Sequence, residues 1–288
     1  MTEPRTHMLE APGAVLHYDV REGGTGDGPV LLLIGSPMAA PGFTTLAGHF
    51  TDRTVVTYDP RGSERSVRTD GAAETTPDEH ADDLHRLIAA LGTGPVDLFA
   101  SSGGAVNALA LVAQHPEQVR TLVAHEPPAS AELPDAKELL AVCEDIRATY
   151  LSSGFEPAMV KFIALVSLQG PVTAEYLNGP GPSPADFGLP TEDDGSRDDP
   201  LLGQNLVTCG PYRHNFEALR AAQTSIVIAV GADSGEEMAA RAARAVAARL
   251  GTEPVEFPDG HGGFLGGEYG QTGKPEAFAA ALRQTIDD

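Results

Sequence analysis

Short apolar runs and helical periodicities alternate along most of this chain. Continuous apolar runs bounded by glycine, proline or polar residues are typical of strands buried on both faces of a sheet. Such runs occur at residues 30–34, 55–59, 96–100, 121–125, 225–230 and 255–257. Apolar residues recur at helical spacing over residues 43–50, 78–91, 105–115, 235–250 and 275–286. Strands that alternate with helices predict an α/β fold, with a mostly parallel central sheet flanked by helices.

The alternation of strands and helices is interrupted in the middle of the chain. Residues 136–170 contain two helical patterns, and a proline- and glycine-rich acidic loop follows them. We therefore expect an α/β core formed by residues 1–129 and 216–288. Residues 130–215, which we call the cap, are expected to form a helical insertion above the C-terminal edge of the sheet, where ligands bind in folds of this kind.

Residues 96–104 join an apolar strand, a tight turn and a helix around Ser102. The small residues Ala100 and Gly104 lie two positions before and two positions after this serine. This spacing is an A-x-S-x-G form of the nucleophile elbow, a turn that raises the serine hydroxyl above the sheet edge. An ordinary strand–helix turn also favours serine and glycine. The segment by itself therefore leaves both interpretations open.

A nucleophilic serine requires a base, and the base requires a carboxylate that orients it. His261 lies between two glycines just after the last predicted strand, and it is the expected base. Asp233, which follows strand 225–230, is the expected acid because the chain order would then be serine, acid and histidine. Glu126 also ends a strand and is the alternative acid. Asp233 could instead cap a helix, and Glu126 could instead anchor the end of its strand.

Backbone N–H groups near the elbow are candidates for an oxyanion hole. One donor is expected from Gly103, the residue after the nucleophile, and the second from the loop after the first long buried strand. In that loop Pro37 has no N–H group. Ser36 is therefore the first candidate for the second donor, and Met38 is the alternative.

Bulky side chains in the cap are candidates for contact with a substrate. We select Phe162, Leu165 and Tyr212, with Tyr150 and Leu168 beside them. For most of these side chains, packing between the cap and the core is the simpler interpretation. The sequence does not identify the substrate itself.

Composition narrows the possible partners. The 288 residues carry 41 acidic and 19 basic side chains, a net charge of −22, which opposes binding to nucleic acid or an anionic membrane. Cys143 and Cys209 are too few and too far apart for a disulfide framework or a thiolate metal site. No apolar segment approaches 18 residues, and no apolar leader is present. We expect a cytoplasmic monomer or homodimer that acts on a small molecule without a metal or cofactor.

Four segments together resemble a known family. They are residues 31–35 (Leu-Leu-Leu-Ile-Gly), residues 58–66, the elbow, and Gly260-His261-Gly262. Across these segments the chain resembles capped serine hydrolases of the α/β-hydrolase fold, of the actinobacterial single-domain type. Asp59-Pro60-Arg61-Gly62 is similar to that family's structural D-x-R-G turn. The chain departs from the family at Ile34, where a histidine commonly precedes the oxyanion glycine.

The resemblance implies hydrolysis of an ester-type carbonyl, in a carboxylic ester or a lactone. The expected route is a Ser-His-Asp triad and an acyl-enzyme, with no metal or cofactor. Acyl transfer, thioester hydrolysis and C–C bond hydrolysis on the same triad are alternatives, as is a ligand-binding member of the fold without catalysis. Serine at the elbow, instead of aspartate, argues against a haloalkane dehalogenase or an epoxide hydrolase.

Overall fold

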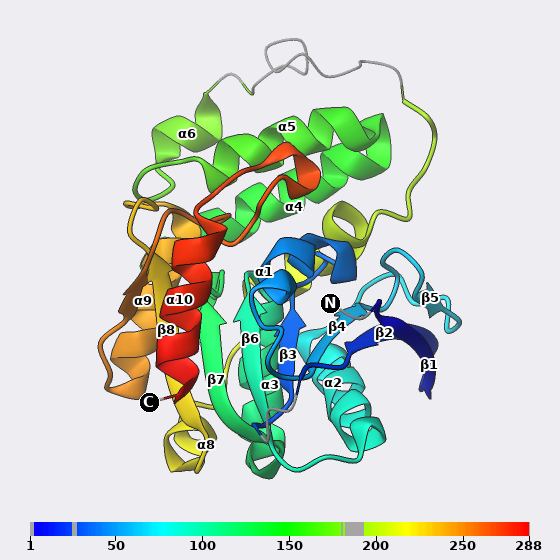
Figure 1. Ribbon diagram of the computed structural model, residues 1–288. Helices are drawn as coiled ribbons and strands as arrows, with labels where there is room; N and C mark the ends of the chain where they lie inside the picture. The colour runs from blue at the N-terminus through cyan, green and yellow to red at the C-terminus, as the bar shows by residue number, and fades with distance from the viewer. Residues whose placement is uncertain (1–2, 25–27, 180, 182–192, 288) are drawn as a thin grey trace.

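The predicted apolar runs form the centre of a mixed sheet (Figure 1). The computed structural model describes residues 3–24, 28–179, 181 and 193–287. Within these residues the sheet has nine strands in the order β1-β2-β4-β3-β6-β7-β8-β9, with β5 paired to β2. The strands are β1 (Arg5–Ala11), β2 (Ala14–Arg21), β3 (Leu31–Ile34), β4 (Val55–Asp59), β5 (Val67–Arg68), β6 (Val96–Ser101), β7 (Val119–His125), β8 (Ser225–Gly231) and β9 (Val255–Phe257).

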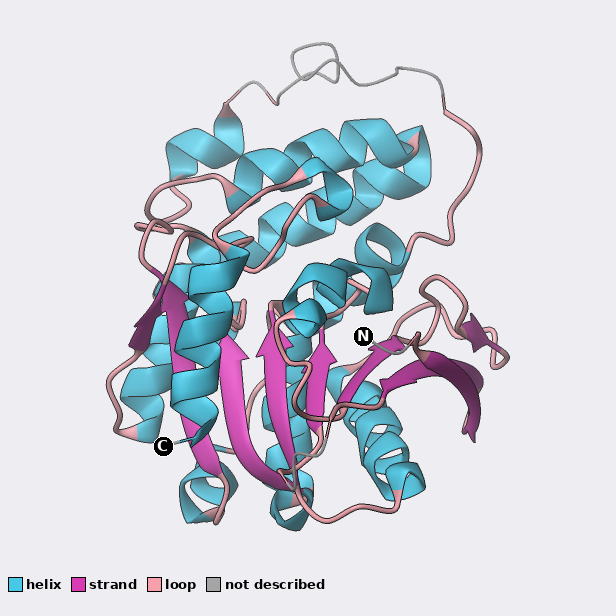
Figure 2. Ribbon diagram, in the orientation of Figure 1, coloured by secondary structure: helices cyan, strands magenta, loops and turns pink. Residues whose placement is uncertain are grey.

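The strands from β4 to β9 in this order are parallel, and they are the strands predicted from apolar runs. β1 and β2 pair antiparallel at one side of the sheet. Every residue of β3, β4 and β6 is buried, because helices cover both faces of this region (Figure 2). The predicted α/β fold with a mostly parallel sheet is confirmed.

Helices from distant parts of the chain either cover the two faces of the sheet or form the cap. They are α1 (Thr44–Gly48), α2 (Pro77–Leu91), α3 (Gly103–Gln114), α4 (Ala136–Ser153), α5 (Phe155–Val166), α6 (Ala174–Asn178), α7 (Leu206–Cys209), α8 (Phe216–Ala221), α9 (Met238–Leu250) and α10 (Pro275–Asp287). α1 and α10 pack on one face, and α2, α3, α8 and α9 pack on the other. None of the helices in the described part of the chain has the length and apolar character needed to cross a membrane.

Local sequence signals set the ends of α2. Thr76 accepts a hydrogen bond from the Glu79 N–H at 3.3 Å, and the Glu79 carboxylate accepts one from the Thr76 N–H at 2.8 Å. This reciprocal capping box satisfies two N–H groups that the first turn of the helix leaves without partners. Gly92 ends the helix with φ 64°, a conformation that glycine adopts without steric cost.

The helices of the cap lie above the C-terminal ends of the parallel strands (Figure 1). The predicted pair of helices over residues 136–170 is confirmed as α4 and α5, which separate at Gly154 with φ 92°. Side chains of α4, α5 and α7 share an apolar cluster that also contacts α9. The boundaries of the cap at residues 130 and 215 remain a prediction, and residues 182–192 of its acidic loop lie outside the described residues.

Three histidines are buried in the fold and uncharged at neutral pH. His80, His125 and His214 are each less than 9% exposed. Burial lowers the pKa of each imidazole to about 4, because the charged form would lose its hydration. The ring nitrogens of His214 have no hydrogen-bond partner among the described residues, and the ring lies against Tyr212 and Phe216.

These buried histidines predict a loss of stability in mild acid. In the unfolded chain a histidine titrates near 6.5, whereas in the fold these three titrate near 4. Between these values the unfolded state binds more protons than the folded state. The contribution of these histidines to the free energy of unfolding is therefore complete above about pH 6.5 and decreases as the pH falls toward 4. Each histidine contributes up to about 1.4 kcal/mol per pH unit in this window.

Urea unfolding between pH 7.5 and 5 measures this decrease. His214→Phe removes one of the three protonation sites. We therefore expect its free energy of unfolding to decrease less steeply with falling pH than that of the wild type, by a slope that corresponds to nearly one proton. Identical pH slopes for the two proteins would contradict the assignment of His214 as a neutral buried group.

Candidate active site

Ser102 occupies a strained turn at the end of β6. Its backbone angles are φ 57° and ψ −130°, a region that residues with side chains rarely adopt. The Ser102 N–H donates to the His125 carbonyl at 2.9 Å, and the Ser102 carbonyl accepts from the Ala105 N–H at 2.9 Å. The turn is therefore held by β7 on one side and by the first turn of α3 on the other.

The glycines after Ser102 allow the elbow to pack against a second loop. A Cβ atom on Gly103 would lie 2.5 Å from the Ser36 carbonyl oxygen, and one on Gly104 would lie 2.7 Å from the Gly35 Cα. Both distances are too short for real contacts with backbone atoms. The elbow therefore requires glycine at these two positions, and it lies directly against the predicted oxyanion loop.

The predicted oxyanion donors lie on these two facing segments. The Gly103 N–H is in the first turn of α3, where no intrahelical acceptor exists. Within the described part of the chain, the N–H groups of Ser36 and Met38 donate no hydrogen bond. These N–H groups thus have no acceptor among the described residues, and their role as an oxyanion hole stays a prediction.

His261 is held by the carboxylate of Glu126. The distance from His261 Nδ1 to Glu126 Oε2 is 2.5 Å, and Glu126 Oε1 accepts a hydrogen bond from the Gly231 N–H at 2.9 Å. Glu126 is fully buried, whereas the His261 side chain is 39% exposed. Burial alone would raise the pKa of Glu126, but the hydrogen bond and charge of His261 outweigh it and lower this pKa to about 2.

The prediction that Asp233 orients His261 is wrong. Asp233 is 62% exposed, and its carboxylate pairs with Lys274 Nζ at 3.0 Å. The Asp233 N–H donates to the Asp259 carbonyl at 3.0 Å, so the segment after β8 lies beside the segment after β9. In this position the Asp233 side chain points to the surface. The alternative acid, Glu126, makes the contact with the histidine instead.

The nucleophile, acid and base candidates follow different strands of one sheet edge. Ser102 follows β6, Glu126 follows β7, and His261 lies four residues after β9. The Ser102 N–H donates to the carbonyl of His125, the residue directly before Glu126, and this bond places the elbow beside the acid. No hydrogen bond between described residues joins the Ser102 hydroxyl to His261, so this contact remains a prediction.

The selected cap residues lie mainly in packing positions. Leu165 is buried in the apolar cluster of the cap, and Phe162 is partly buried against that cluster. The Tyr212 hydroxyl donates to Asp78 Oδ1 at 2.7 Å, at the first turn of α2, which does not support the predicted contact with a substrate. The sequence does not predict that Cys209 lies beside the elbow, where its sulfur is 3.4 Å from the Cβ position of Gly103. No local signal in the sequence distinguishes this cysteine.

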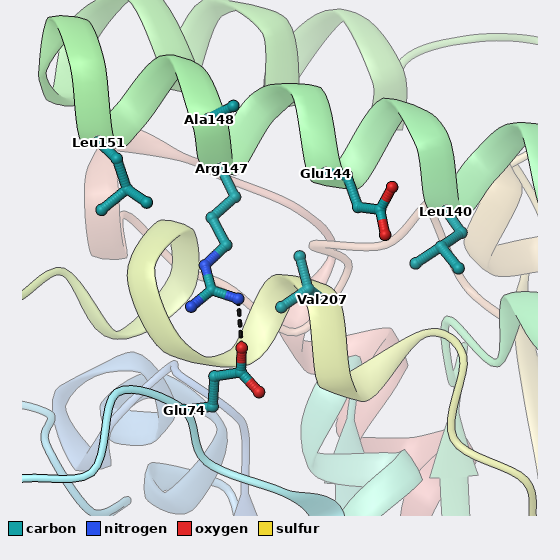
Figure 3. A pocket seen from close by; sticks show the side chains of 7 residues that line it. All are labelled: Glu74, Leu140, Glu144, Arg147, Ala148, Leu151 and Val207. Atoms are coloured by element: carbon teal, nitrogen blue, oxygen red, sulfur yellow. Dashed lines mark hydrogen bonds and ion pairs between the residues drawn. The ribbon is translucent and has the colours of Figure 1, made fainter.

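A separate cavity of about 370 Å³ lies between α4, α7 and the segment before α2 (Figure 3). Arg147 of α4 crosses it to form an ion pair with Glu74, and Leu140, Glu144 and Leu151 line the same space. None of the predicted catalytic residues lines this cavity. The ion pair connects helix α4 of the cap to the segment before α2.

A strained serine between strand and helix, beside a histidine that pairs with a buried acid on the same sheet edge, defines the class of α/β-hydrolases. Residues 28–167 match the family described as alpha/beta hydrolase fold. Over 267 residues the chain is 33% identical to an uncharacterized hydrolase, YraK, of Bacillus subtilis (strain 168), and the match covers 89% of each chain. The chain therefore belongs to the α/β-hydrolase fold family, which confirms the predicted resemblance.

Two solved structures share the fold at low sequence identity. A thermophilic esterase from Thermogutta terrifontis superposes with a TM-score of 0.67 at 19% identity, covering 99% of this chain and 98% of its own. The enol-lactonase from Burkholderia xenovorans LB400 superposes with a TM-score of 0.67 at 16% identity, covering 98% of this chain and 100% of its own.

The close approach at Gly104 predicts a measurable loss of stability. We expect Gly104→Ala to lower the free energy of unfolding by about 1–3 kcal/mol, because its methyl group would displace the Gly35 backbone. Gly94→Ala is the matched control, since nothing lies within 4 Å of its Cβ position. Urea denaturation of both variants checks the prediction, and a Gly104→Ala protein as stable as the control would contradict it.

Proposed function

We propose that this protein is a serine hydrolase that cleaves an ester-type carbonyl, in a carboxylic ester or a lactone. Ser102 is the nucleophile, His261 the base and Glu126 the acid of the triad. One observation carries the proposal: the buried Glu126 carboxylate lies 2.5 Å from His261 Nδ1, at the same sheet edge as the strained Ser102.

The mechanism follows from the protonation of His261. With its Nδ1–H donated to Glu126, the imidazole leaves Nε2 unprotonated to accept the Ser102 hydroxyl proton. The serine oxygen attacks the carbonyl carbon and forms a tetrahedral oxyanion. The oxyanion accepts hydrogen bonds from the N–H groups of Gly103 and Ser36, with Met38 as the alternative second donor.

Collapse of the tetrahedral intermediate expels the alkoxide, which takes the proton from His261 Nε2 and leaves as an alcohol. The acyl group remains on Ser102 Oγ. His261 then removes a proton from a water molecule, whose oxygen attacks the acyl carbon. Collapse of this second intermediate releases the carboxylic acid and returns the proton to Ser102.

Glu126 supplies the electrostatic part of this mechanism. Its pKa of about 2 keeps the carboxylate ionised throughout the neutral range. A buried anion stabilises the imidazolium that forms during attack more strongly than an exposed anion, because little water screens the interaction. Glu126 and its 2.9 Å bond from the Gly231 N–H also keep the ring in one tautomer and one orientation.

The relatives with similar folds support an ester-type substrate. One is a thermophilic esterase and another an enol-lactonase, so both have names that refer to hydrolysis of ester-type bonds. We extend this chemistry to the present chain as part of the proposal. Bulky side chains of the cap, such as Phe162, are proposed to set the substrate range. A cytoplasmic location is proposed from the sequence.

Fluorophosphonate labelling tests the nucleophile. An activated serine reacts rapidly with such a probe, so Ser102 is expected to be the labelled residue in peptide mass spectrometry. Ser102→Ala should abolish labelling and turnover of a panel of p-nitrophenyl esters, lactones and acyl thioesters. Labelling of Ser101, or a folded wild type that neither labels nor hydrolyses any member of the panel, would refute the proposal.

Paired amide substitutions test the acid. Glu126→Gln keeps the size of the side chain but removes the charge opposite His261, and we expect turnover to fall about 10⁴-fold, as when a serine-protease triad loses its carboxylate. Asp233→Asn is the matched control and is expected to keep turnover within about twofold, since Asp233 pairs with Lys274 at the surface. Circular dichroism confirms folding of both variants. The reverse pattern of losses would reinstate Asp233 as the acid.

A further inference from the structure

His125 is a buried imidazole without an obvious structural purpose. It is the last residue of β7, it has no solvent exposure, and its ring lies among Phe99, Phe257, Phe264 and Phe278 with centroids 5.2–6.3 Å away. Its Nε2 atom has no hydrogen-bond partner among the described residues. An unsatisfied buried polar group costs about 1–3 kcal/mol, a cost that phenylalanine in the same cage would avoid.

The same histidine contacts all the segments that carry the proposed triad. Its Nδ1 lies 3.2 Å from the hydroxyl oxygen of Ser101, the residue before the nucleophile. Its carbonyl accepts the Ser102 N–H at 2.9 Å. Its ring is stacked beneath His261 with centroids 5.8 Å apart and planes inclined by 28°, and the next residue in the chain is Glu126.

We propose that His125 is a positioning residue that fixes the elbow and the catalytic histidine relative to each other. This inference rests on the proposed function. The side-chain bond to Ser101 supports the strained turn from the β7 side. The face of the His125 ring limits the tilt of the His261 ring. The hydrogen bond from His261 to Glu126 fixes only one edge of the His261 ring. Burial keeps the pKa of His125 near 4, so the ring remains neutral beneath the imidazolium that forms on His261.

The proposal predicts that activity and stability respond in opposite directions. The double variant Ser101→Ala/His125→Phe replaces both polar partners by apolar groups, a change that is nearly neutral or stabilising when the shapes fit. Its melting temperature should therefore equal or exceed that of the wild type. Its kcat should fall by at least about tenfold and by at most about 10²-fold, the loss that a misplacement of about 1 Å causes. KM should stay within about twofold, because His125 is buried away from solvent.

Single variants and a control complete the experiment. Ser101→Ala and His125→Phe each break the same hydrogen bond, so the loss of kcat in the double variant should be smaller than the product of the two single losses. His214→Phe is the matched control. It also replaces a buried, unpartnered histidine in an aromatic environment, yet it lies in none of the segments of the triad, and its kcat should stay at the wild-type value.

A folded double variant with wild-type kcat, or single losses that multiply, would overturn the positioning role. If His125→Phe fails to fold, Ser101→Ala decides alone, since it keeps the imidazole and removes only its partner: a reduced kcat at unchanged KM supports the role, and wild-type kcat refutes it. If the wild type is active and the Ser101 and His125 variants keep its kcat, only this inference is contradicted. An inactive wild type that does not label with fluorophosphonate contradicts the hydrolase proposal as well.

Discussion

The hydrogen bond between the buried Glu126 carboxylate and His261 is the interaction on which the organisation of the site depends. A carboxylate without solvent exposure is stable only when it is paired and hydrogen-bonded. Glu126 meets this condition through His261 on one oxygen and the Gly231 N–H on the other. Removing either partner would leave part of a buried charge unsatisfied. The parallel sheet must therefore hold the ends of β7 and β8, and the loop after β9, in one fixed arrangement.

The position of the acid on β7 changes the role of the neighbouring strand. β8 ends at Gly231, where a Cβ atom would lie 2.6 Å from Ser234 Oγ and 2.7 Å from the Asp259 carbonyl oxygen. A side chain has no space at this point, so β8 contributes a backbone donor instead of a carboxylate. Asp233, two residues later, is free to pair with Lys274 at the surface. The carboxylate therefore lies at the end of β7, and its backbone donor lies at the end of the neighbouring strand β8.

The sequence predicts the core of this fold well and the acid poorly. β4 and β9 have the predicted bounds, because apolar runs between turn residues leave few alternatives. β1 was not predicted, since its side chains are mostly exposed and carry no apolar pattern. Ser102 and His261 have local glycine signals, whereas the choice between Glu126 and Asp233 depends on backbone directions at two strand ends. Glu126 has φ 48°, and no pattern of residue types indicates that angle in advance.

Among the described residues, three of the five non-glycine residues with positive φ lie around the proposed chemistry, and Glu64 and Tyr269 are the other two. Ser102, Glu126 and Asp259 all have positive φ without being glycine, with values of 57°, 48° and 72°. Such conformations cost about 1–3 kcal/mol each and persist only where the surrounding structure enforces them. His125, with its unpartnered nitrogen, adds a further cost between Ser102 and Glu126. The large apolar clusters on both faces of the sheet offset these costs, so the rigid core is the condition that allows an otherwise unfavourable site to exist.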